Sequence, residues 1–86
     1  MSPLEKARAA YRDGEDIWPS MEKAIKENDT LAQKTAQDRY RKDLAIVRSC
    51  MPSLTGRDLD IAKSFEFNLN SEMNGVNPIY GGGVYQ

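Results

Sequence analysis

The sequence predicts an all-α fold, in which a helical hairpin packs with a third helix and an extended C-terminal tail follows. Two long segments, on either side of Pro52, repeat apolar residues at intervals of three to five. Capping signals stand at the starts of the expected helices. From Gly75 the chain carries glycines, tyrosines and a proline but no charged residue. We therefore expect a small three-helix domain at 1–74 and a tail at 75–86.

The first expected helix begins at the N-terminus. Ser2 and Glu5 form a capping box around Pro3, which occupies the first helical position where its missing amide costs nothing. The following residues are strong helix formers, and Gly14 offers a left-handed cap. The sequence therefore predicts a short helix that ends at Gly14.

A second helical piece is expected after Gly14. Trp18 precedes Pro19, and this arrangement disfavours the helical region for the tryptophan and lets the proline open a new helix toward Asn28. The kink would fix the direction of the Trp18 indole. The indole then either fills the space inside the hairpin or is exposed as a binding anchor. The alternative is one bent helix across 2–28.

The central helix is predicted at 30–51, with Thr30 and Gln33 as its capping box and Pro52 as its stop. The short polar connection before it indicates an antiparallel hairpin. Its apolar residues share one face: Leu31, Ala36, Tyr40, Leu44, Val47 and Met51.

The last helix is predicted to start near Thr55, which has Asp58 three residues on as a capping signal. One apolar stripe follows it: Leu59, Ala62, Phe65, Leu69 and Met73. From Gly75 the four glycines make a helix unfavourable. The tail nevertheless spaces apolar and aromatic side chains along its length, which favours docking in a groove or at a sheet edge over a plain linker.

Composition limits the function classes. The chain has 86 residues, a net charge of −1 and an isoelectric point near 5.3, so bulk nucleic-acid binding is disfavoured. A single cysteine excludes an internal disulfide and favours a reducing cytoplasm. There is no apolar run of the roughly 20 residues that span a bilayer, so we expect no membrane association.

Catalysis is also disfavoured, because histidine is absent and one cysteine cannot hold zinc. Two acidic pairs remain, Glu15 with Asp16 and Asp58 with Asp60, and neither has a neighbour in sequence that would raise a carboxyl pKa. We therefore expect no catalytic residue, no cofactor and no metal.

Three groups of residues are candidates for binding a partner. Lys34, Arg41 and Arg48 are seven residues apart and share one helix face. The alternative is a solvated face, with Asp38 paired to Lys42 and Arg39 to Asp43. The remaining candidates are the tryptophan and the tail side chains: Trp18, Ile79, Tyr80, Val84 and Tyr85.

These features predict a non-catalytic protein-binding module, a small inhibitor or accessory factor of a larger protein machine. Short chains without motifs are typical of phage and mobile elements, which is an association only. The alternative is a structural subunit of a homo-oligomer or virion-type assembly, with the tail as an inter-subunit clasp. A helix-turn-helix DNA binder is less favoured, since the last helix sets Arg57 and Lys63 against three acidic residues, and an enzyme is the least favoured.

Overall fold

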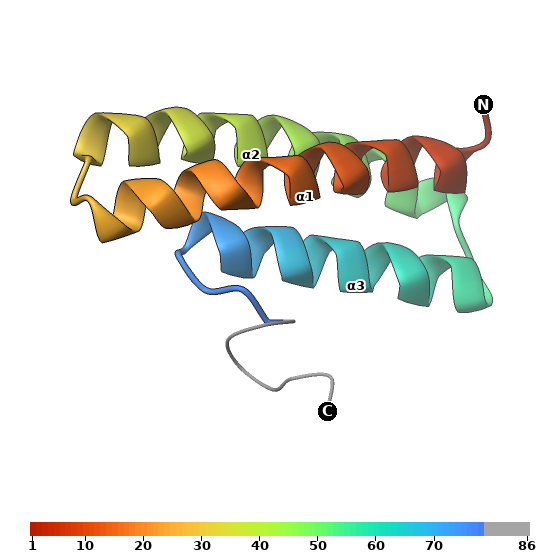
Figure 1. Ribbon diagram of the computed structural model, residues 1–86. Coiled ribbons are helices and arrows are strands. Elements are labelled where there is room, and N and C mark those ends of the chain that lie inside the picture. The colour runs from red at the N-terminus through yellow and green to blue at the C-terminus, as the bar shows by residue number, and fades with distance from the viewer. Residues whose placement is uncertain (79–86) are drawn as a thin grey trace.

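The computed structural model describes residues 1–78. They form three helices, α1 (Pro3–Lys26), α2 (Thr30–Cys50) and α3 (Gly56–Met73), with a 3₁₀ turn, η1 (Met51–Ser53), before the last. No strand occurs in the described part of the chain, so the predicted all-α class is confirmed. Helices α1 and α2 lie antiparallel, and α3 runs alongside them (Figure 1). None of these helices is long and apolar enough to cross a membrane.

Helix α1 corrects the prediction of two N-terminal pieces. The Ser2 capping box forms as expected, but the helix continues through Gly14 and Pro19 to Lys26. Gly14 is buried, and a Cβ atom there would collide with the side chain of Leu69 on α3. Pro19 removes one backbone hydrogen-bond donor from the helix. Burial of the apolar face of α1 on both sides of Pro19 offsets the free-energy cost of that missing bond. The single-helix alternative is therefore the right one.

Helix α2 begins where predicted, with a different cap. The Asp29 carboxylate accepts the amide of Ala32 at 3.0 Å, which makes Asp29 the N-cap in place of Thr30. The Gln33 amide group donates to the carbonyl oxygen of Ala24 at 3.2 Å and so ties α2 to α1. Leu31, predicted on the buried face, is 75% exposed because it lies in the first turn, beyond the reach of α3.

Helix α3 supplies the third layer of the core. Thr55 is its N-cap residue, although the expected side-chain cap bond is absent in residues 1–78. The rings of Tyr11 and Phe65 stack with centroids 4.4 Å apart, which packs α3 on α1. After α3 the chain turns at Gly75, with φ of 88°, and Asn77 and Pro78 are buried. The core also contains Cys50, a free buried thiol.

Candidate functional site

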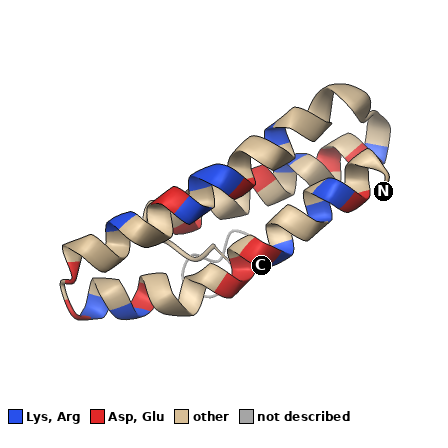
Figure 2. Ribbon diagram, turned by 90° about the horizontal axis from the view of Figure 1, so that it is seen from above, with Lys and Arg blue, Asp and Glu red and all other residues tan. Residues whose placement is uncertain are grey.

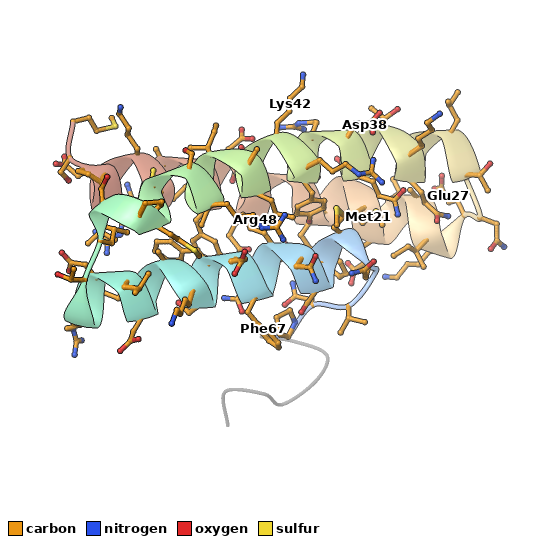
Figure 3. The ribbon with its side chains drawn as sticks, turned by 180° about the vertical axis from the view of Figure 1, so that it is seen from behind. Met21, Glu27, Asp38, Lys42, Arg48 and Phe67 are labelled. Carbon is orange, nitrogen blue, oxygen red and sulfur yellow. The ribbon has the colours of Figure 1, made fainter. Side chains whose placement is uncertain are left out.

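The three predicted basic residues lie exposed along α2, where two of them are paired within the protein. Arg41 contacts Asp38 at 2.7 Å, and Arg48 reaches across to Glu66 of α3 at 2.6 Å. Lys34 has no ion pair in residues 1–78. Figure 2 shows basic and acidic residues interspersed along the helices, and Figure 3 shows Arg48 directed toward α3. The stripe is therefore largely a neutralised face.

The predicted helix pairings do not form. Asp38 pairs with Arg41 three residues on, because the planar guanidinium reaches its carboxylate. Arg39 contacts Asp13 of α1 at 3.5 Å, so it links the two arms of the hairpin. The expected pairs of Asp38 with Lys42 and of Arg39 with Asp43 were wrong: Asp38 pairs with a nearer residue of its own helix, and the contact of Arg39 with α1 was invisible in the sequence pattern.

The aromatic candidates are only partly placed by the structure. Trp18 lies within α1, half-buried and packed against the core, as a plug of the bundle would be. The four tail candidates lie outside the described residues: Ile79, Tyr80, Val84 and Tyr85. Trp18 and the basic residues therefore do not converge on one site.

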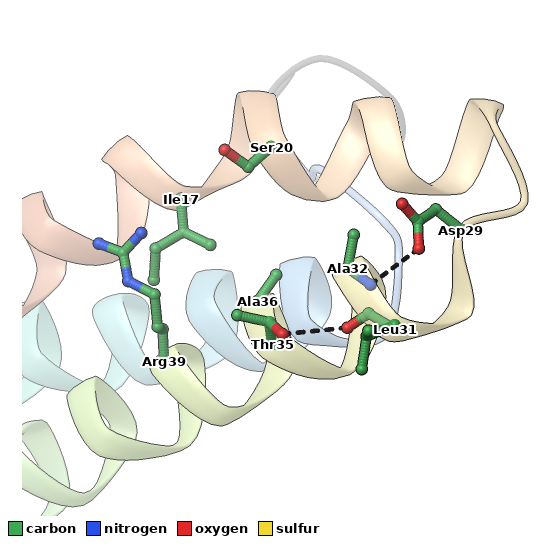
Figure 4. A pocket seen from close by; sticks show the side chains of 8 residues that line it. All are labelled: Ile17, Ser20, Asp29, Leu31, Ala32, Thr35, Ala36 and Arg39. Carbon is green, nitrogen blue, oxygen red and sulfur yellow. Dashed lines mark hydrogen bonds between the residues drawn. The ribbon is translucent and has the colours of Figure 1, made fainter.

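One hollow in the described surface lies between α1 and α2. It has a volume of about 420 Å³ and begins near the hairpin turn at Asp29. Figure 4 shows Ile17 and Ser20 of α1 facing the α2 wall. That wall is formed by the residues Leu31, Ala32, Thr35, Ala36 and Arg39. We call this hollow the hairpin groove.

The hairpin groove continues toward the other end of the hairpin. A second hollow of about 320 Å³ is lined by Ala9, Asp13 and Ile46 among others. Because Asp13 lines this hollow and Arg39 lines the first, their ion pair lies between the two. One face of the hairpin is therefore hollowed along much of its length.

A different arrangement occupies the core, where one polar side chain from each helix meets the others. Glu72 of α3 is fully buried, and the Tyr40 hydroxyl of α2 donates to its Oε1 at 2.9 Å. The Glu72 carboxyl also contacts that of Glu15 on α1. Burial, and then the contact with Glu15, raise the pKa of Glu72 to about 9. Burial beside Glu72 likewise raises the pKa of Tyr40.

A second carboxyl pair joins α1 to α2 beside the groove. Asp43 is buried and contacts Asp13, whose side chain is half exposed. Burial and the contact with Asp13 raise the pKa of Asp43 to about 7, against the attraction of Arg39. The structure thus holds two acid pairs, each of which uses α1.

Sequence reasoning missed both Asp43 and Glu72. Yet buried positions on α2 and α3 alternate by three and four, and these two acids stand in that series: Ala36, Tyr40, Asp43, Val47 and Cys50; Ala62, Phe65, Leu69 and Glu72. An acid inside such a series was the available signal. For Glu72 the apolar stripe was instead continued to Met73, one position away.

The chemistry available to these groups is proton binding and packing. No cluster of three potential metal ligands occurs among residues 1–78. The fold and its surface define a three-helix bundle that is hollowed along the hairpin and, separately, between α2 and α3, where a hollow of about 520 Å³ is found. Comparisons with protein-family models, curated proteins and solved structures find no match to this chain.

Proposed function

We propose that this chain is a non-catalytic protein-binding module, a small inhibitor or accessory factor of the kind that phage and mobile elements encode. The observation that carries the proposal is the hairpin groove, which α3 leaves uncovered. Leu31, 75% exposed at its wall, places an apolar side chain in water. An apolar hollow between two rigid helices suits recognition of a partner protein.

The groove fits an amphipathic helix of the partner. The hairpin groove lies between two antiparallel helices and is lined in part by the small residues Ser20, Ala32 and Ala36. Another helix can therefore approach the groove closely. Leu31 supplies an exposed apolar contact on the α2 wall, and the buried Ile17 forms part of the floor of the groove. Helix-in-groove binding of this type uses apolar residues at three- and four-residue spacing on the partner.

Electrostatics and the tail have supporting roles in this proposal. Lys34 and Lys42 are exposed and have no ion pair within residues 1–78, so they remain available to steer an acidic partner. The tail residues add uncharged aromatic anchors by composition: Ile79, Tyr80, Val84 and Tyr85. The free thiol of Cys50 accords with action in the cytoplasm.

The test is affinity capture from the lysate of the host, quantified by mass spectrometry, with matched variants. Leu31→Glu places a charge in the groove, and Phe67→Glu places one at the separate hollow between α2 and α3, at an apolar residue that is also exposed (Figure 3). We expect one partner protein to be captured at least tenfold less by the Leu31→Glu variant than by the wild type. The Phe67→Glu variant should capture that protein as the wild type does. Equal capture by both variants would refute the groove.

A third copy lacking residues 79–86 tests the tail separately. The deletion begins at Ile79 because Asn77 and Pro78 are buried against the bundle. We expect reduced capture with unchanged helical circular dichroism. Molar mass in solution addresses the alternative of a homo-oligomeric subunit, since a monomer at all micromolar concentrations would exclude self-assembly through this face.

A further inference from the structure

Three titratable side chains meet inside the bundle, one from each helix. Glu72 of α3 and Tyr40 of α2 are both 0% exposed, and the Tyr40 hydroxyl donates to Glu72 Oε1 at 2.9 Å. Glu15 of α1 contacts the other side of the Glu72 carboxyl. A buried tyrosine-carboxyl-carboxyl cluster therefore joins all three helices at the C-terminal end of α3.

The hydrogen bonds in this cluster can be completed by one proton. Glu72 Oε2 and Glu15 Oε1 are both buried, and neither has a donor within residues 1–78. Two ionised carboxylates in contact repel each other and accept without donating. If one of the two carboxyl groups holds a proton, its O–H donates to the other, and both buried oxygens gain a partner.

The charged surroundings offer no substitute for that proton. From α1 the facing group is Glu15, and from α2 it is Tyr40. The nearest basic influence is that of Arg39, which acts on Tyr40 and on the neighbouring Asp43 pair and whose own ion pair is with Asp13. Among residues 1–78 no cation is paired with the two carboxyl groups, so one shared proton is what limits them to a single negative charge.

We propose that Glu15 and Glu72 form a proton-operated latch, in which one proton shared by the two carboxyl groups fastens the C-terminal end of α3 to the α1–α2 hairpin. When that proton is lost, two adjacent negative charges are buried without a counterion, and this end of α3 separates from the hairpin. The latch is independent of the proposed partner binding.

The latch also holds the chain that follows α3. The Gly75 amide donates to the Glu72 carbonyl oxygen at 2.9 Å, and the Val76 amide donates to that of Ser71 at 2.9 Å. The Gln37 side chain of α2 donates to the Met73 carbonyl oxygen at 3.2 Å. Release of Glu72 therefore loosens residues 69–78, which lead directly into the tail.

The direction of the pH effect follows from linkage. An unfolded glutamate loses its proton near pH 4.5, whereas Glu72 in the folded protein retains it to about pH 9 because its pKa is raised. Between these values the unfolded state binds fewer protons, so a rise in pH favours unfolding. The stabilisation is complete at low pH and is lost as pH increases through this range. The Asp43 pair adds a similar loss of stability, which is at half its maximal slope near pH 7 and fades above it.

The upper part of the range, from about pH 8 to 9, therefore isolates the latch, because Asp43 is only half titrated at pH 7. The experiment is urea unfolding of the full chain at several pH values in this window. In the wild type we expect the unfolding constant to rise by up to about tenfold per pH unit, or ~1.4 kcal/mol. Glu72→Gln keeps an acceptor for Tyr40 and gives Glu15 a permanent donor, so its slope should be close to zero.

Two further variants complete the design. The Glu15→Gln variant offers the Glu72 carboxylate an amide donor and removes the second negative charge. The pH range over which this variant loses stability should therefore move to lower pH. Glu22→Gln, at an exposed glutamate of the same helix, should follow the wild type. A wild-type stability that is constant or increases from about pH 8 to 9 would overturn the latch, as would an unchanged slope in Glu72→Gln.

A local measurement separates release of α3 from global unfolding. Hydrogen exchange, corrected for intrinsic rates, should show faster opening of residues 69–78 at pH 8.5 than at pH 6.5, and at each pH these residues should open more often than the middle of α2, which opens only on global unfolding. Carbon-13 NMR of the Glu72 carboxyl should place its titration well above the ordinary glutamate value of 4.5. Exchange that is equal at the two pH values, or a Glu72 titration near that ordinary value, contradicts the proposal.

Discussion

The two sides of α1 differ in how closely they are packed. Toward α3, Gly14 lets Leu69 approach the backbone, and the Glu15–Glu72 pair is enclosed without a cation. Toward the open face of α2, the hairpin groove is hollow, and Asp13 has an exposed basic partner in Arg39. We call these the α3 seam and the groove side.

The same chemical group consequently has different properties on the two sides. Each side holds a pair of carboxyl groups, but the pKa is raised to about 9 for Glu72 in the seam and to about 7 for Asp43 near the groove. The seam excludes water from Glu72 altogether, whereas Arg39 and solvent reach Asp13. Burial without a cation, more than the proximity of two acids, therefore sets the size of the effect.

The largest expected contrast comes from adding volume on each side. Gly14→Val places methyl groups against Leu69, which is fully buried and cannot move aside, so we expect a loss of about 3 kcal/mol from overpacking. Ser20→Val adds a similar side chain in the groove and should change stability by less than about 0.5 kcal/mol. Urea unfolding measures both, and equal losses would remove the distinction between the sides.

A smaller effect is expected from one hydroxyl in the seam. Tyr40→Phe leaves Glu72 Oε1 buried without its donor, and we expect a loss of about 1–3 kcal/mol. Because the Tyr40 bond lowers the pKa of Glu72, its removal should raise that pKa further. Tyr11→Phe, which removes a half-buried hydroxyl that accepts from Asn68, is the matched control and should leave the Glu72 titration in place. A lowered Glu72 pKa in Tyr40→Phe would contradict this account.

The helices were predictable because their signals are local. The Ser2 capping box and the apolar spacing of α2 and α3 depend on neighbours in sequence, and both appear in the structure. The prediction for α1 was wrong at Gly14 and Pro19 because the local preference of both residues favours an interruption of the helix. What determines the outcome at Gly14 is contact with Leu69, which is distant in sequence.

The sites were less predictable for the same reason. Glu15 was considered with its neighbour Asp16, whereas its partner is Glu72 on another helix. Arg39 was assigned to Asp43 in its own helix but contacts Asp13 across the hairpin. A sequence pattern gives the face on which a charge lies, and only the packing of helices decides which opposite or like charge it meets.

The smallest effect concerns the cation on the groove side. Arg39 and Asp13 are each about half exposed, so Arg39→Gln should cost less than about 1 kcal/mol at neutral pH. Its removal should nevertheless raise the pKa of Asp43 above about 7, because Arg39 attracts the ionised form. The range over which stability falls with rising pH would then extend upward.

Carbon-13 NMR titration of the Asp43 carboxyl measures this shift directly. Arg41→Gln is the matched control, because Arg41 lies on the same helix and pairs with the exposed Asp38. We expect the control to leave the Asp43 titration unchanged. If Arg39→Gln also leaves it unchanged, Arg39 does not moderate this pair, and the contrast between the two carboxyl pairs arises from burial alone. If the midpoint rises, the groove side differs from the seam in charge as well as in packing.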